Sequence, residues 1–204
     1  DDVVDDGALL LFGAQGSVRI WDGGRVSTVI ERIPGEEASR FNDVIADPLG
    51  RVFCGTMSSP DHPGRLYRLD RDGSLRVVVE RVGTSNGMGF TLDGTAMYYT
   101  DSAAREIYLF DYDEESGEIS NQRVFVHSDE RDGVPDGMTV DAEGCVWSAH
   151  WGGSCVIRYT PDGVEERRIQ LPAQQVSCVT FGGGDYRDMY ITTAGGHRKD
   201  ELGA

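Results

Sequence analysis

The chain contains an internal repeat, in which three segments are variants of one pattern. They read FNDVIADPLG, SNGMGFTLDG and PDGMTVDAEG, and their final glycines lie 44 and then 50 residues apart. In each segment an oxygen-bearing side chain, that of Asn42, Asn86 or Asp136, lies eight residues before the glycine. A short apolar segment follows each glycine: RVFCGTM, TAMYYTD and CVWSAHW. A repeat of this length indicates a fold assembled from copies of one structural unit, which places those oxygens at equivalent positions.

A second series of segments interleaves with the first. SVRIWDGG, RLYRLDRDG, EIYLFDYDEESG and CVIRYTPDG alternate apolar and polar residues, and three of them end in a DG or SG pair. Alternation predicts β-strands with one buried face, and glycine supplies the positive φ of a tight turn. A third, more polar series, RVSTVIE, LRVVVE, QRVFVH and ERRIQL, is typical of outer strands. A divergent further copy of the first series begins at Val176.

Three or four short strands in every 40–50 residues are typical of a β-propeller blade. The sequence therefore predicts an all-β protein with about four blades represented. At 204 residues, one domain spanning residues 1–204 is expected. Since the chain begins inside one blade and ends soon after a strand, we expect its ring of blades to be incomplete.

Composition limits the partners. The formal net charge is −16, which disfavours binding to nucleic acid or to an anionic membrane surface, because both select basic patches. No stretch approaches the ~20 apolar residues of a membrane-spanning helix, and no signal peptide is visible at the N-terminus. The expected partner is a small molecule, and the sequence leaves the oligomeric state open.

The four cysteines are widely spaced and form no CxxC motif, so a zinc or thioredoxin-like site is not indicated. Cys54 and Cys145 occupy matching places in the repeat, inside apolar segments. Buried free thiols are the favoured interpretation, and they fit a reducing compartment. We therefore predict a cytoplasmic location.

Several longer strings closely resemble the SMP-30/gluconolactonase/regucalcin-like family. They are RFNDVIADPLGRVFCGTM, SNGMGFTLDGTAMYYTDS, FDYDEESGEI, VPDGMTVDAEGCVWSAHWGG, VIRYTPDG and SCVTFGGGDYRDMYITTA. The resemblance covers roughly residues 8 to 195, and the motifs match in order. It implies a six-bladed propeller with one divalent metal ion near its axis, commonly used to hydrolyse sugar lactones.

The resemblance also implies roles for individual residues. The metal-binding Asn of the family's SNG motif corresponds to Asn86, and the Asp of its PDG motif corresponds to Asp136, which is also the usual candidate for the general base. The substrate-binding Arg and Asn of the RxND motif correspond to Arg40 and Asn42. The family's third metal ligand, a Glu of its first blade, has no counterpart in this sequence, so we expect one metal ligand and part of the ring to be missing.

These residue types suit the implied chemistry. A divalent cation polarises a lactone carbonyl and lowers the pKa of bound water. Amide and carboxylate oxygens favour calcium, with magnesium, manganese and zinc as alternatives. Asp136 would accept the proton of the attacking water, and Arg40 and Asn42 would hold substrate oxygens.

Other interpretations stay open at this point. Asn86-Gly87 and Asp136-Gly137 are also ordinary turn dipeptides, and Asn42-Asp43 is compatible with an Asx turn. For function, the alternatives to a metal-dependent lactonase are a non-catalytic calcium-binding or interaction propeller, or an inactive truncated fragment.

Overall fold

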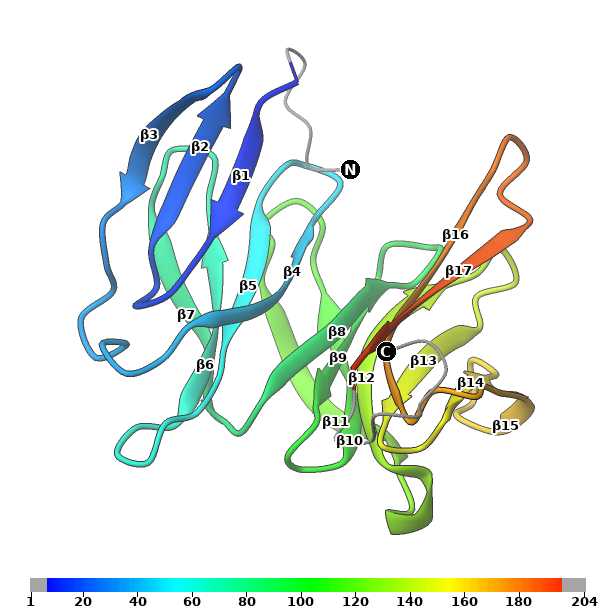
Figure 1. Ribbon diagram of the computed structural model, residues 1–204. Coiled ribbons are helices and arrows are strands. Elements are labelled where there is room, and N and C mark those ends of the chain that lie inside the picture. Colours follow the sequence, from blue (N-terminus) through cyan, green and yellow to red (C-terminus); the bar gives the residue numbers. More distant parts are fainter. Residues whose placement is uncertain (1–6, 196–204) are drawn as a thin grey trace. The chain divides into compact units, whose positions relative to one another are not determined.

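The computed structural model describes residues 7–195, and this part of the chain is built from strands, with one short 3₁₀ helix (Figure 1). The all-β prediction is confirmed. The chain divides into two compact units, one ending at Ser85 and the other beginning at Asn86. The number of blades and the single domain stay predictions, and each unit is described by itself.

The first unit contains a three-stranded sheet in the order β1-β2-β3 and a four-stranded sheet in the order β4-β5-β6-β7. Strands that follow one another in the chain pair antiparallel within each sheet, as expected when short turns connect them. The strands are β1 (Leu9–Phe12), β2 (Val18–Asp22), β3 (Arg25–Ile30), β4 (Phe41–Ala46), β5 (Val52–Thr56), β6 (Gly64–Leu69) and β7 (Leu75–Val82).

The second unit contains the sheet β8-β9-β10-β11 and a larger sheet, in which β12-β13-β14-β15 and the hairpin β16-β17 meet at one residue pair, Trp151 with Gln175. The 3₁₀ helix η1 (Glu130–Asp132) precedes β12. The strands are β8 (Ser85–Phe90), β9 (Ala96–Asp101), β10 (Glu106–Tyr112), β11 (Ile119–His127), β12 (Val134–Val140), β13 (Val146–Trp151), β14 (Cys155–Tyr159), β15 (Glu165–Gln170), β16 (Gln175–Gly182) and β17 (Asp188–Ala194).

The eight-residue offset of the repeat equals one strand and the turn that follows it. Asn42, Asn86 and Asp136 lie near the starts of β4, β8 and β12, the first strands of the three four-stranded meanders. At the other end, the side chain of Asp47 or Asp141 accepts hydrogen bonds from two backbone N–H groups of the turn. The turn glycines have positive φ, which favours glycine: 80° at Gly50, 68° at Gly94 and 79° at Gly144.

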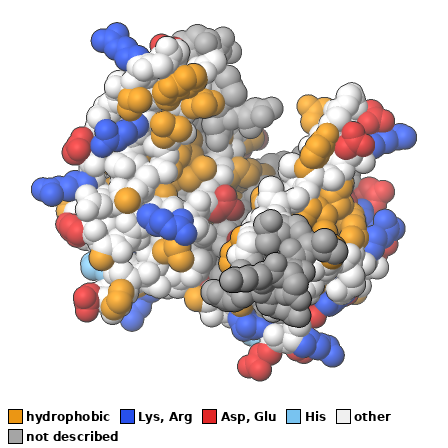
Figure 2. All heavy atoms as spheres, viewed as in Figure 1, with side chains coloured by type: hydrophobic (Ala, Val, Ile, Leu, Met, Phe, Trp, Pro, Cys, Tyr) orange, Lys and Arg blue, Asp and Glu red, His pale blue; other side chains and the backbone are white. Residues whose placement is uncertain are grey.

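The alternating apolar residues of the strands form the core between sheets. In the first unit, Val18 and Ile33 pack with Phe41, Cys54 and Tyr67 between the β1–β3 and β4–β7 sheets. The β1–β3 sheet also exposes apolar side chains, and Figure 2 shows such side chains gathered over the surface that these strands form. They are Leu9, Leu11, Trp21, Val26 and Val29.

Two such clusters lie among the described residues of the second unit. One joins the β8–β11 sheet to β12–β14 through residues such as Tyr98, Met138 and Ile157, and the other joins β13 and β14 to β16 through Trp147 and Val176. The predicted outer strands correspond to β3, β7, β11 and β15, which expose at least half of their residues. Among the described residues, no helix is long and apolar enough to cross a membrane.

The predicted free thiols are confirmed. All four cysteines are unpaired. Cys54, Cys145 and Cys155 are buried, and Cys178 is exposed. Burial raises the pKa of the Cys54 thiol, so this group stays protonated and acts as a small apolar side chain.

Candidate functional site

In the first unit, the structure brings Arg40 and Asn42 together at the start of β4. The Nη1 group of Arg40 donates to the side-chain Oδ1 of Asn42 at 2.8 Å and to the carbonyl of Phe41 at 2.9 Å. The Nδ2 group of Asn42 donates to the carbonyl of Ser85 at 2.9 Å. Both ends of the Asn42 amide are therefore engaged by protein groups. Arg40 is exposed, and its Nε and Nη2 make no hydrogen bond to the described residues, which leaves them available to a ligand.

The residue after Asn42 is a partly buried carboxylic acid that sequence reasoning missed as an ionisable group. Asp43 lies in a β-bulge, where the pairing of β4 with β5 shifts between Phe41 and Val44. Its Oδ1 accepts a hydrogen bond from the Val44 N–H at 2.8 Å, so the carboxyl bonds within its own strand. Burial raises its pKa, because the charged form loses water contacts. An Asp directly before the apolar residues VIA in the segment FNDVIA was the available signal.

In the second unit, Asn86 is only 8% exposed, and its amide orientation is fixed by Ser102. The Ser102 hydroxyl donates its one hydrogen to the carbonyl of Pro135 at 2.6 Å. It can then only accept from Asn86, whose Nδ2 lies 3.0 Å away. The Oδ1 of Asn86 faces the other way and accepts no hydrogen bond from the described residues.

Asp136 lies on the strand beside Asn86. A Cβ at Gly87 would lie 2.5 Å from the Asp136 carbonyl oxygen and 2.7 Å from the Met138 nitrogen, so β8 and β12 approach as closely as only glycine permits. Asp136 itself lies in a β-bulge, where the pairing of β12 with β13 shifts between Pro135 and Met138. The structure thus brings the two predicted metal ligands to adjoining positions on neighbouring strands.

The loop that leads into Asp136 is held from two sides. Arg105 donates to the carbonyls of Gly133 at 2.6 Å and Asp129 at 2.9 Å. Arg168 pairs with both carboxylate oxygens of Asp132. These contacts fix η1 and the start of β12, and so limit the freedom of the Asp136 backbone.

His150 supports the same loop from inside the unit. It is fully buried, and its Nδ1 lies 3.1 Å from the Asp132 carbonyl. Burial lowers its pKa to about 4, so the ring is neutral at physiological pH. His150 therefore supports the loop as a neutral, buried ring.

The implied cation can be tested against these residues. Asn86, which is 8% exposed, offers an amide oxygen that accepts no hydrogen bond from residues 7–195, and Asp136 brings a carboxylate on the adjoining strand. Both are the hard oxygen donors that calcium or magnesium prefers. In the part of the chain that the structure describes, no group of three or more His, Cys, Asp or Glu side chains is placed to hold a metal ion. The pair fits a cation whose remaining coordination positions are filled by water or by other ligands.

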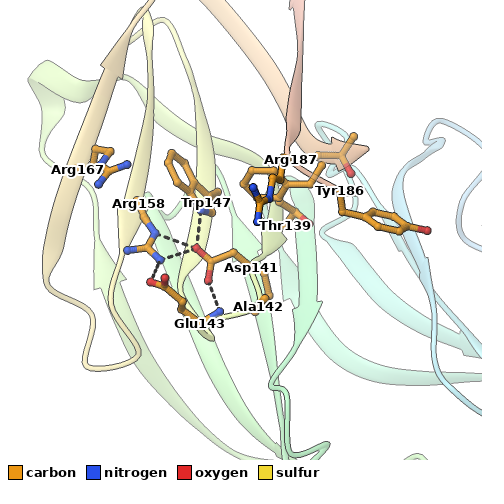
Figure 3. Close-up of a pocket in the computed structure, with 12 residues that line it drawn as sticks. Thr139, Asp141, Ala142, Glu143, Trp147, Arg158, Arg167, Tyr186 and Arg187 are labelled. Carbon is orange, nitrogen blue, oxygen red and sulfur yellow. Dashed lines mark hydrogen bonds and ion pairs between the residues drawn. The ribbon is translucent and has the colours of Figure 1, made fainter. Parts of the chain in front are cut away.

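A pocket of about 720 Å³ lies elsewhere in the second unit, between the end of β12 and the β16–β17 hairpin (Figure 3). Thr139 and Asp141 are among the residues that line it. Asp141 lies roughly 16 Å along the chain from Asp136, at ~3.3 Å per residue of extended strand. Its strongest polar groups satisfy one another, since Asp141 accepts from both Trp147 and Arg158 at 2.8 Å. This network stabilises the turn, and the pocket is not the candidate site.

The sequence profile of the family described as SMP-30/Gluconolactonase/LRE-like region matches residues 3–195. Pentonolactonase XacC of Haloferax volcanii is 51% identical over 192 residues, covering 94% of this chain and 65% of that protein. Regucalcin of Danio rerio is 39% identical over 175 residues, covering 83% of this chain and 59% of that protein. The chain thus spans less than two thirds of the length of these relatives.

A solved structure is also similar. The crystal structure of regucalcin from Agrobacterium tumefaciens, described as a calcium-binding protein, has a TM-score of 0.86 and 28% sequence identity. The alignment covers 97% of this chain and 68% of that one.

Proposed function

The chain belongs to the SMP-30/Gluconolactonase/LRE-like family, and from this premise we propose that it is a lactonase that hydrolyses a sugar-acid lactone with the help of one divalent cation. The observation that carries the proposal is the adjoining placement of Asn86 and Asp136, with an Asn86 oxygen to which none of the described residues donates a hydrogen bond. Similarity to a pentonolactonase supports the substrate class. Similarity to a calcium-binding regucalcin supports calcium as the cation, with magnesium, manganese and zinc as alternatives.

Asn86 and Asp136 would hold the cation, which when bound polarises the lactone carbonyl and lowers the pKa of water. The Asp136 carboxylate accepts the proton of the attacking water, which makes the water a stronger nucleophile. The contacts of the loop before Asp136 restrain the backbone that carries that carboxylate.

Arg40 and Asn42 are the proposed substrate-binding residues. The free Nε and Nη2 groups of Arg40 are donors for hydroxyl or carboxylate oxygens. Asn42 retains one N–H and one lone pair for a sugar hydroxyl, because each end of its amide makes one hydrogen bond to protein.

We propose the six-bladed propeller as the complete architecture, with the four-stranded meanders as its blades and β1–β3 and β16–β17 as parts of blades. The unpaired thiols support a cytoplasmic location. The alternative function is calcium binding without turnover. It is favoured by one observation, that the adjoining pair contains a single carboxylate.

Replacement of Asp136 by Asn tests the proposal. We expect turnover on a panel of sugar-acid lactones, followed by acid release, to fall about 10²- to 10⁴-fold, the usual contribution of a general base. Asp162→Asn, at an exposed turn residue, is the matched control and should retain full turnover. Undiminished hydrolysis by Asp136→Asn with normal metal content would refute the mechanism. Calcium binding by the unaltered chain without turnover on any lactone would favour the alternative.

A further inference from the structure

We propose that Ser102 is a positioning residue that turns the Asn86 oxygen toward the bound cation. This inference rests on the proposed function, because it concerns the same cation. Ser102 is 5% exposed and directly follows β9, where a turn holds it: its carbonyl accepts from the Arg105 N–H at 3.1 Å. The side chain of the preceding Asp101 accepts from the Ala103 N–H at 3.1 Å.

The oxygen and NH₂ ends of an amide side chain are similar in size, but one accepts hydrogen bonds and the other donates them. A neighbouring group must therefore select the orientation of the amide. The Pro135 carbonyl, a pure acceptor, consumes the only hydrogen of the Ser102 hydroxyl. What remains on Ser102 is a lone pair, which attracts the Asn86 NH₂ and repels its oxygen. The serine therefore selects the orientation that leaves Oδ1 open, which is the orientation a cation needs.

The same hydroxyl connects both proposed ligands. Pro135 directly precedes Asp136, and its ring fixes φ, so a bond to its carbonyl restrains the backbone that presents the carboxylate. One buried side chain thus links the Asn86 amide to the strand of Asp136. Groups in this position around metal sites typically contribute 10- to 100-fold to metal affinity.

The repeat supplies a matched control. Ser102 lies eight residues after Gly94, and Ser58 lies eight residues after Gly50. Ser58 is exposed, and its contact is a backbone one, from its N–H to the Gly83 carbonyl at 2.8 Å. Its hydroxyl bonds to none of the described residues, so its removal should leave cation binding unchanged.

The test is titration of the purified chain with Ca²⁺ by calorimetry. Ser102→Ala should lower Ca²⁺ affinity about 10- to 100-fold, whereas Ser58→Ala should match the unaltered chain. Unfolding curves check that each variant is folded. If Ser102→Ala does not fold, Ser102→Cys serves instead, because it keeps the shape and is a weaker hydrogen-bonding group.

Making Ser102→Ala in an Asn86→Asp variant separates the positioning of Asn86 from a general structural role of Ser102. The carboxylate of Asn86→Asp presents oxygens on both faces and needs no orientation by Ser102. Ser102→Ala should therefore cost much less Ca²⁺ affinity in the Asn86→Asp background than in the native one. An equal loss in both backgrounds, or no loss in either, overturns the inference while leaving the lactonase proposal in place. Absence of Ca²⁺ binding by the unaltered chain overturns the cation proposal, and this inference with it.

Discussion

Asn42 and Asn86 occupy the same position of the repeat, yet their amides are used differently. Asn42 donates directly to the carbonyl of Ser85, the residue that precedes Asn86. The Asn42 oxygen accepts a hydrogen bond from Arg40. Asn86 reaches the corresponding carbonyl, that of Pro135, only through Ser102, and its oxygen stays open. The two asparagines differ in two ways. The Ser102 hydroxyl lies between Asn86 and the Pro135 carbonyl, and no described arginine donates to the Asn86 oxygen as Arg40 donates to that of Asn42. An amide oxygen becomes a candidate ligand only where its neighbours leave it free.

The residues that follow extend the contrast. Asp43 follows Asn42 and places a carboxyl inside its strand, where burial raises its pKa. Gly87 follows Asn86 and has no side chain, so β12 packs closely against β8 at this position. In the second unit the carboxylate comes instead from Asp136 on the neighbouring strand. The two regions share a backbone pattern and differ in which strand supplies the acid.

Replacing the two asparagines by alanine is the strongest test of this contrast. Asn86→Ala should lower Ca²⁺ affinity by at least about 100-fold, since loss of a direct ligand exceeds the effect of an outer-shell partner. Asn42→Ala should leave Ca²⁺ affinity unchanged and weaken substrate binding, seen as a raised KM. Equal losses of Ca²⁺ affinity in the two variants, measured by calorimetry, would show that the contrast is wrong.

Gly87→Ala tests the close approach of β8 to β12. The new Cβ meets backbone atoms, which cannot rotate away, so we expect a loss of about 1–3 kcal/mol in the free energy of unfolding in urea. Gly184→Ala is the control, because a Cβ there has no heavy atom within 4 Å and its φ is not positive. If the two variants are equally stable, β8 and β12 are farther apart than the structure places them.

Asp43→Asn should give the smallest effect, a gain in stability at neutral pH below the ~1 kcal/mol typical of point substitutions. The pKa of Asp43 is raised on folding, so the unfolded chain ionises first as pH increases above the usual carboxyl value of 3.8. The native protein therefore loses stability with rising pH, and the neutral amide does not. The advantage of Asp43→Asn should shrink as pH falls toward 3.8 in urea unfolding measured across pH.

Asp93→Asn is the opposite case and serves as the comparison. The pKa of Asp93 is lowered, first by a hydrogen bond from the Thr91 hydroxyl and then by bonds from Thr95. Its charged form is favoured on folding, so this substitution should lower stability at neutral pH. A gain in both variants would mean that the gain in Asp43→Asn comes from removal of a negative charge in general and not from the raised pKa of Asp43.

Much of the fold was predictable because it depends on local rules. Alternating apolar residues predicted the strands, and the turn glycines Gly50, Gly94 and Gly144 all have the positive φ that their segments require. The positions of Asn86 and Asp136 at the starts of first strands followed from the same repeat. The role of Ser102 could not be predicted in this way, because it depends on Asn86 and Pro135, which are distant in the chain.

The sequence by itself determined the strand segments, the turns, the family and the set of candidate residues, since period and residue type act over short distances. Only the tertiary structure decided that Gly87 packs against the Asp136 backbone, that Ser102 orients Asn86, and that Arg40 occupies the Asn42 oxygen. The reason is physical: a hydrogen-bonding group commits its donor or acceptor to whatever folding brings within about 3 Å, and a repeated sequence position does not specify that neighbour.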